Sequence, residues 1–352
     1  MLPLDQAWYR RLIGLAALLG LVAGLLGMLY LAGTGAATDL VFGDPRISAW
    51  SGDWWWIPLT AIGGVAVTAL RRRWRVPARV PSGVETIESG RVDHATAPSW
   101  LAIAAVSAVT SASLGPSFSL VIAGGALGSW LAARRWIDDE ARLDYTLTGM
   151  AGGLGGAFTS PILGMFMVTE LAPIPRQRYL AALIPQLIAA TIGFGLYYAI
   201  AGRTFLGIYG LPPYEFSLWH IGVAVILGSV ASLIMGVFAL ILLAVRFVAV
   251  LVGSDYAWGL TGGAIVGLIA AVLPLTLGAG SVQLDTVIDE STEISVWLLV
   301  AVLLGKILAM AVSLSSGFIG GNVFPMIFVG GTAGTVVTSP SPTCPPPWQS
   351  RR

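Results

Sequence analysis

Two stretches of the chain carry residue types that can hold an anion. Residues 115–128 align without a gap on residues 321–334, with glycine at four coinciding positions and phenylalanine at a fifth. Each copy begins as irregular backbone marked by glycine and proline and then enters an apolar helix, so the amide N–H groups of its first turn lack carbonyl partners. Those amides and the helix dipole, equivalent to roughly half a positive charge at the N-terminus, attract anions. We interpret the two copies as an internal duplication.

Each copy interrupts a helix at its glycine, and the glycines have two possible roles: close helix packing or an ion site. The presence of the interruption in both copies decides between them. Small residues let transmembrane helices pack closely, and for either copy alone we favour that explanation. Broken helices at matching places in two halves of a membrane protein indicate instead a substrate site near the bilayer midplane. We therefore expect an ion site between the breaks at 114–118 and 317–325. Its candidate groups are neutral dipoles, which suit conduction because tight binding would stop it: the hydroxyls of Ser82 and Ser117 and the amides of Asn322 and Val323.

The composition places these breaks in a membrane. Of the 352 residues, 56% are hydrophobic and 11% charged, and the mean hydropathy is +0.83, which no water-soluble domain of ordinary composition matches. The net charge of +1 gives no sign of a nucleic-acid partner. We expect an all-α polytopic membrane protein with a first half over 1–203, a second half over 204–337 and a disordered or aberrant, proline-rich tail over 338–352.

The arginines predict an orientation. Arg10 and Arg11 precede the first apolar run, five arginines lie between residues 71 and 79 after the second run, and the loop between the runs has only Arg46. Because positive residues stay on the cytoplasmic side, we expect a cytoplasmic N-terminus and an outer loop at 44–50.

Other chemistry has little support. The single cysteine, Cys344, excludes a disulfide framework within the chain and a cysteine-cluster metal site. His94 and His220 lack the spacing of metal ligands, and the sequence contains no P-loop, nucleophile elbow or His-Glu metalloprotease helix. We expect no enzyme activity, no cofactor and no metal.

The apolar runs predict the helices that position the breaks. Ser82 followed three residues later by Glu85 is a capping-box pattern and predicts a short helix. The runs 100–112 and 118–133 are shorter than the ~20 residues of a crossing, as in a discontinuous pair of helices. The other predicted helices are 12–32, a span ending near residue 70, 149–158, 162–171, 179–200, 218–252 (too long for one crossing, hence tilted or broken), 258–277 and 294–314.

Two charged residues lie in or beside apolar runs, where charge is costly and often functional. Glu170, at the end of the run 162–171, is either a proton-carrying carboxylate or, as we slightly favour, an interfacial one. Lys306, the only lysine, either lends positive potential to an anion path or reaches the membrane surface.

These motifs resemble those of the CLC family of chloride channels and anion/proton exchangers. GFIGGNVFP at 317–325, preceded by Gly305-Lys306, looks like the family's G-K and G-x-x-G-G-x-F-x-P region. AFTSPILG at 157–164 is similar to its A-F-N-A-P-L-A-G stretch. LGPSFS at 114–119 lies where the family has G-R-E-G-P or G-P-E-x-P, and Ser82-Gly83-Val84 lies where it has G-S-G-I-P.

The resemblance runs from about residue 12 to residue 337. It implies a homodimer in a cell membrane, each subunit holding its own pore for chloride between two inverted halves of tilted and discontinuous helices. The residues it implies as anion ligands are Ser82 and Gly83, the amides of Asn322 and Val323, and, for an outer site, the amides near Ser117 and Phe118.

The sequence departs from the family at several functional positions. The outer gating glutamate falls on Ser117, and the inner proton-transfer glutamate of the exchangers falls on Leu171, directly after Glu170. Val323 replaces the phenylalanine of G-x-F-x-P, and Glu85 replaces the proline after the Ser82 motif. The family also continues into further helices, the last of which supplies a pore tyrosine, and nothing after residue 337 fits that helix.

Three functions remain open from the sequence. The leading one is a passive pathway for chloride, since the gating and proton glutamates are absent. The second is proton-coupled chloride exchange, in which Glu170 replaces the missing pair. The third is a non-conducting membrane scaffold, because the expected C-terminal helices are missing.

Overall fold

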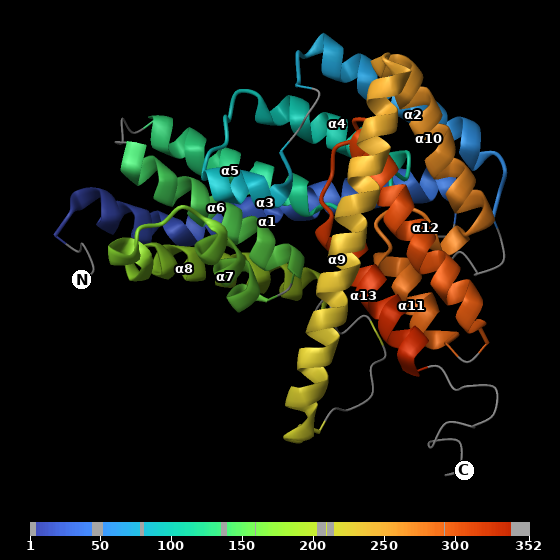
Figure 1. Ribbon diagram of the computed structural model, residues 1–352. Coiled ribbons are helices and arrows are strands. Elements are labelled where there is room, and N and C mark those ends of the chain that lie inside the picture. The colour runs from blue at the N-terminus through green and yellow to red at the C-terminus, as the bar shows by residue number, and fades with distance from the viewer. Residues whose placement is uncertain are drawn as a thin grey trace.

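The computed structural model describes residues 5–43, 52–77, 81–134, 139–158, 160–202, 209, 215–291 and 293–338. Over these ranges the regular elements are helices, as expected for an all-α fold (Figure 1). The α-helices are α1 (Ala7–Phe42), α2 (Trp56–Arg73), α3 (Gly83–Ser89), α4 (Ala97–Val109), α5 (Ser117–Arg134), α6 (Asp139–Phe158), α7 (Pro161–Leu171), α8 (Tyr179–Ala201), α9 (Trp219–Val252), α10 (Asp255–Val272), α11 (Ser281–Asp289), α12 (Val296–Ser315) and α13 (Val323–Thr338). Short 3₁₀ helices, η1 (Arg176–Arg178) and η3 (Pro274–Thr276), precede α8 and follow α10.

Five helices of the described part are long and apolar enough to cross a membrane. They are Ala7–Phe42, Arg176–Ala201, Trp219–Val252, Asp255–Val272 and Val296–Ser315. α1 has 36 residues and α9 has 34, against the ~20 of a perpendicular crossing, so both helices must be tilted. Figure 1 shows them running in different directions through the molecule. The long apolar run at 218–252 therefore forms one tilted helix, and the alternative of a break is wrong.

α1 continues past the predicted end at residue 32 as far as Phe42. The added turns contain polar residues that satisfy their own hydrogen bonds. The hydroxyl of Thr34 donates to the carbonyl of Tyr30 at 2.7 Å, and that of Thr38 donates to the carbonyl of Thr34 at 2.8 Å. The helix can extend because these hydroxyls need no water.

The order of elements repeats along the chain. A long helix (α1, then α9) is followed by a shorter span (α2, α10), a very short helix (α3, α11), a further helix (α4, α12) and a helix that starts after a glycine break (α5, α13). α2 packs directly on α10, since a Cβ added to Gly64 would overlap the carbonyl of Gly259. The boundary between the halves at residue 203 lies outside the described residues and stays a prediction.

The glycines of the predicted helix 149–158 serve close packing. α6 lies among α1, α5 and α8. A Cβ added to Gly149 would overlap the carbonyl of Gly124 on α5, and one added to Gly155 would overlap the carbonyl of Ala190 on α8. The chain breaks at Ser160 and α7 begins at Pro161, as predicted. α6 is therefore the centre of the first series of helices.

Lys306 does not reach the membrane surface, so that alternative is wrong. Its side chain is 0% exposed, and its ammonium group donates to the carbonyls of Thr276 at 3.0 Å and Gly278 at 2.6 Å. The same group lies 5.2 Å from the ring centre of Phe328 on α13. Burial is possible because the two carbonyls and the ring face replace water around the charge. Lys306 thus ties α12 to the segment between α10 and α11.

Candidate anion site

The two glycine breaks meet in space. Gly115 and Gly321 form an antiparallel bridge, in which each backbone N–H donates to the carbonyl of the other at 2.6 and 2.7 Å. α5 starts two residues after Gly115, and α13 starts two residues after Gly321. A Cβ on Gly321 would overlap the hydroxyl of Ser117, and one on Gly115 would lie 2.8 Å from Cβ of Phe324. The bridge therefore needs glycine on both sides, and it brings two helix starts together.

Equivalent aromatic residues support the two helix starts. Phe118 and Phe324 occupy matching places in the repeat, three residues after the bridging glycines. Phe118 stacks on Trp100 with ring centres 6.0 Å apart, and Phe324 stacks on Phe158 with ring centres 5.5 Å apart. These contacts explain why phenylalanine occurs in both copies: each ring fixes the first turn of its helix against a neighbouring helix.

Three of the predicted site residues line one cavity of about 640 Å³. Ser82 at the start of α3, Phe118 on α5 and Asn322 before α13 come from distant parts of the sequence and face this space, which we call the first cavity. Gly83 adjoins it, because a Cβ added there would lie 3.5 Å from the Cα of Phe118. Val323 is the first residue of α13 and directly follows Asn322.

The capping box predicted at Ser82 is confirmed. The backbone N–H of Glu85 donates to the Ser82 hydroxyl oxygen at 3.1 Å, and the backbone N–H of Ser82 donates to the Glu85 carboxylate at 2.8 Å. The Ser82 oxygen is thus an acceptor for the helix, while its O–H remains a donor that can turn toward an anion. The Glu85 carboxylate also lines the first cavity, so it places a negative charge beside the expected site.

Arg246 is a cavity residue that our sequence reasoning missed. It lies on α9 and lines the first cavity, as does Glu85, which carries the opposite charge. The signal was present in the sequence, since Arg246 is the one arginine in the 34-residue apolar helix α9, and charge within a membrane helix is a functional candidate by default. A cation at this place raises the local concentration of anions.

A second cavity of about 230 Å³ lies beyond the break. Pro116 lines this second cavity and Phe118 lines the first, so Ser117 lies between them. Ser117 is 3% exposed, and its hydroxyl has no hydrogen-bond partner within the described part of the chain. Gly278 lines the second cavity, and its carbonyl accepts a hydrogen bond from the ammonium group of Lys306. The buried ammonium group therefore lies directly behind the wall of the second cavity.

Glu170 lines neither cavity. It is exposed at the end of α7, and its carboxylate accepts a hydrogen bond from the hydroxyl of Tyr179. This placement favours an interfacial carboxylate. As for metals, the described residues contain no group of three His, Cys, Asp or Glu side chains able to hold an ion.

Comparison with known proteins decides the family. Residues 63–346 match the family described as Voltage gated chloride channel. The chain belongs to this family. It is 30% identical to an uncharacterized protein of Methanocaldococcus jannaschii over 207 residues, 57% of this chain and 50% of that protein. It is 27% identical to the H(+)/Cl(-) exchange transporter ClcA of Vibrio parahaemolyticus over 273 residues, 72% of this chain and 56% of that protein.

Two solved antiporter structures share the fold of this chain. A slow cyanobacterial Cl⁻/H⁺ antiporter superposes with a TM-score of 0.77 at 19% identity, covering 93% of this chain and 79% of the antiporter. A CLC-type fluoride/proton antiporter gives a TM-score of 0.75 at 19% identity, with coverages of 94% and 81%. The resemblance drawn from the sequence motifs and the expected fold class are both confirmed. The chain spans about half the length of the curated relatives that it matches.

Proposed function

We propose that this protein provides a pathway for a small anion, most readily chloride, across a membrane. The observation that carries the proposal is the Gly115–Gly321 bridge, which brings the starts of α5 and α13 together between the two cavities. Ser82, Asn322 and Val323 offer neutral donors to the anion from the side of the first cavity. Ser117 and Phe118 offer them between the two cavities. Neutral donors can replace the water around an anion without binding it so tightly that it cannot leave the site.

We propose further that transport is passive. The family's gating position holds Ser117, which cannot carry a proton, and Leu171 occupies the position of the inner proton glutamate. The alternative is coupled exchange, which the curated names of several relatives favour. Exchange would require Glu170 to deliver protons, although it lines neither cavity.

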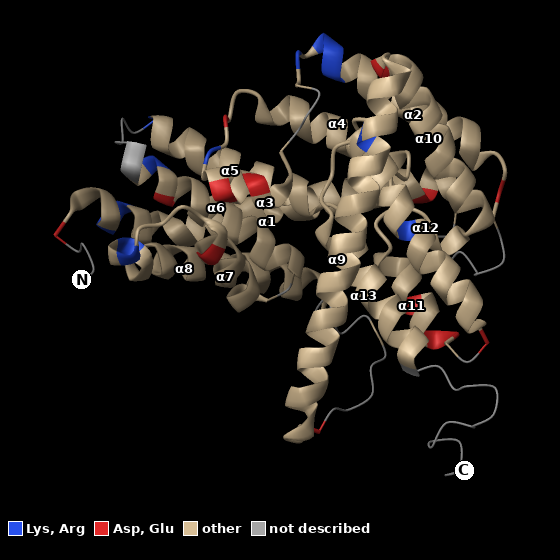
Figure 2. Ribbon diagram, in the orientation of Figure 1, with Lys and Arg blue, Asp and Glu red and all other residues tan. Residues whose placement is uncertain are grey.

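The distribution of charge supports a cytoplasmic N-terminus. Figure 2 shows arginine residues at the N-terminal end of α1 and at the end of α2, and acidic residues around α11. By analogy with the family, we propose that the protein lies in the plasma membrane as a homodimer.

The outer loop predicted at 44–50 lies outside the described residues, and cysteine labelling tests its position. In a Ser48→Cys variant in which Cys344 is also replaced, the new thiol should react with an impermeant reagent added outside.

Flux into vesicles tests the proposed function. Purified protein should pass chloride faster than gluconate, and Ser82→Ala should change the ranking of small anions because it removes one donor. Glu88→Gln on the same short helix is a matched control, since Glu88 is exposed and outside the cavity lining. Chloride flux equal to that of protein-free vesicles would leave the non-conducting scaffold as the better description.

A further inference from the structure

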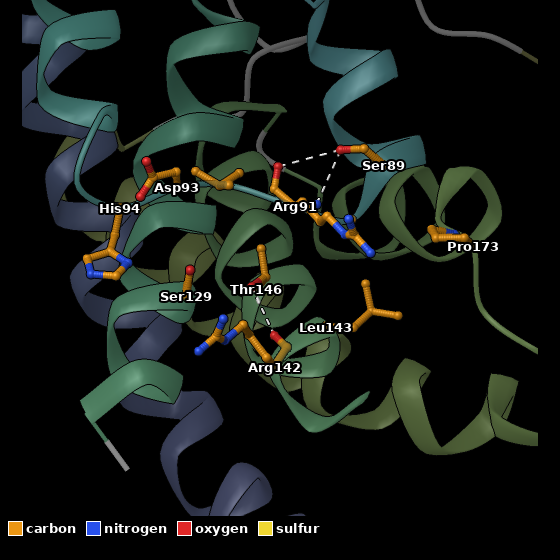
Figure 3. Close-up of a pocket in the computed structure, with 11 residues that line it drawn as sticks. Ser89, Arg91, Asp93, His94, Ser129, Arg142, Leu143, Thr146 and Pro173 are labelled. Carbon is orange, nitrogen blue, oxygen red and sulfur yellow. Dashed lines mark hydrogen bonds between the residues drawn. The ribbon is translucent and has the colours of Figure 1, made fainter. Parts of the chain in front are cut away.

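A hollow of about 720 Å³ (Figure 3) has a lining separate from that of the two cavities of the anion site. It is formed by the loop between α3 and α4, the end of α5, the start of α6 and the segment after α7. Its polar lining consists of two arginines, one aspartate, one histidine and three hydroxyl residues: Arg91, Arg142, Asp93, His94, Ser89, Ser129 and Thr146. This is the end of the bundle where the N-terminal arginines also lie, and where we propose the cytoplasmic membrane surface.

The two arginines occupy different parts of the rim. In Figure 3 the Arg142 side chain extends toward Ser129, whereas that of Arg91 extends toward Leu143. Guanidinium groups are well suited to phosphate oxygens. Their separation, and a volume in the range of ligand pockets, fit a bulky phosphate-bearing group better than a small inorganic ion.

An apolar groove of about 340 Å³ adjoins this hollow. His94 lines both, and the rest of the groove comes from α1, α4 and α5. Its walls include Leu26, Leu101, Ala126 and Trp130. Trp130 is 41% exposed, and the guanidinium of Arg134 lies 5.0 Å from its ring centre, an arrangement typical of the interface between hydrocarbon and headgroups.

We propose that the hollow and the groove together bind one anionic phospholipid. The phosphate and headgroup lie among Arg91, Arg142 and Ser129, and an acyl chain lies along the groove past Ala126 and Trp130. A charged hollow that opens into an apolar groove matches the two ends of such a molecule, and neither feature alone would select it. The site is independent of the anion pathway, so it can be tested without flux.

The test measures thermal unfolding of the delipidated protein in detergent with added phosphatidylglycerol or phosphatidylcholine. Phosphatidylglycerol should raise the Tm more than phosphatidylcholine does. Arg91→Gln with Arg142→Gln should weaken the apparent affinity for phosphatidylglycerol about 25-fold, at about five-fold for each arginine. Arg73→Gln, which removes an exposed arginine at the end of α2, should leave it unchanged. Ala126→Trp should weaken binding of the lipid by filling the groove.

Three results would overturn the proposal. The proposal requires that inorganic phosphate alone does not reproduce the effect, so an equal rise in Tm with phosphate would identify a site for the free ion instead. An unchanged preference for phosphatidylglycerol in the double variant removes the role of the arginines. If the double variant does not fold, native mass spectrometry of the unmodified protein decides the matter, because equal retention of the two lipids contradicts a specific site.

Discussion

Gly115 and Gly321, which align with each other in the internal repeat, hydrogen-bond to each other through both of their backbone N–H groups. Equivalent residues that pair in this reciprocal way indicate a local pseudo-two-fold relation between the two breaks. The relation gives the repeat a structural role, because the backbone before each helix start is paired with that of the other copy. Neither break can form this site without its partner.

The bridge predicts a strong effect of adding one methyl group. Gly321→Ala should abolish anion flux, since the new Cβ would overlap the Ser117 hydroxyl and force the two helix starts apart. Gly330→Ala on the same helix is the control, because a Cβ there meets nothing within 4 Å. Flux and thermal unfolding are measured together. Equal flux in the two variants would show that the helix starts do not form the pathway.

Glu85 should hinder anions that enter the first cavity. Its carboxylate lines the cavity and is held by the backbone N–H of Ser82. Glu85→Gln keeps an acceptor for that N–H but removes the charge, so the apparent affinity for chloride on the arginine-rich side should rise about two- to five-fold. Glu88→Gln serves as the control. An unchanged or lower affinity in Glu85→Gln would exclude the electrostatic role.

Arg246 should draw anions into the same cavity. Arg246→Gln should reduce chloride flux at low ionic strength and have a smaller effect at high salt, because salt screens the attraction. Arg246→Lys should retain most of the flux, since it retains the charge. The measurement is the initial rate of chloride flux against ionic strength. A loss that is independent of salt would mean that Arg246 acts through packing of α9.

The position of Ser117 predicts uncoupled transport and a way to add a gate. The unmodified protein should show no uphill proton movement driven by a chloride gradient, and little dependence on outer pH. In Ser117→Glu the ionised carboxylate, present at higher pH, should occupy the helix start and block flux. Acidification protonates it and should relieve the block. Uphill proton transport in the unmodified protein would support the exchanger and direct attention to Glu170.

Lys306 should matter for stability. Lys306→Met leaves the carbonyls of Thr276 and Gly278 without their charged donor, at a cost of about 1.5 to 3 kcal/mol for each bond. The Tm in detergent should fall accordingly. Leu304→Met, an exposed position on the same helix, is the control. An unchanged Tm would show that the two carbonyls find other partners.

Features that depend on neighbouring residues could be predicted from the sequence. The capping box of Ser82 and Glu85 joins residues three apart, and the break before Pro161 follows from proline chemistry. The membrane class followed from composition, and the repeat from the alignment of two short stretches. The family motifs then identified the fold. In each case the determining interaction either joins residues a few positions apart or is the preference of a whole apolar segment for lipid over water.

The tertiary structure decided which distant residues meet. The repeat predicted that the two breaks share one site, but only the structure shows that Gly115 and Gly321 pair through their backbones. The hydrogen bond from Lys306 to Thr276 joins segments that no sequence pattern relates. Lys306 was expected at the surface or near the path, and the carbonyls between α10 and α11 together with the ring of Phe328 make its complete burial possible. Arg246 faces the first cavity because of how α9 packs against α12. A helical sequence sets which residues share a face, but the neighbouring helices determine what that face contacts.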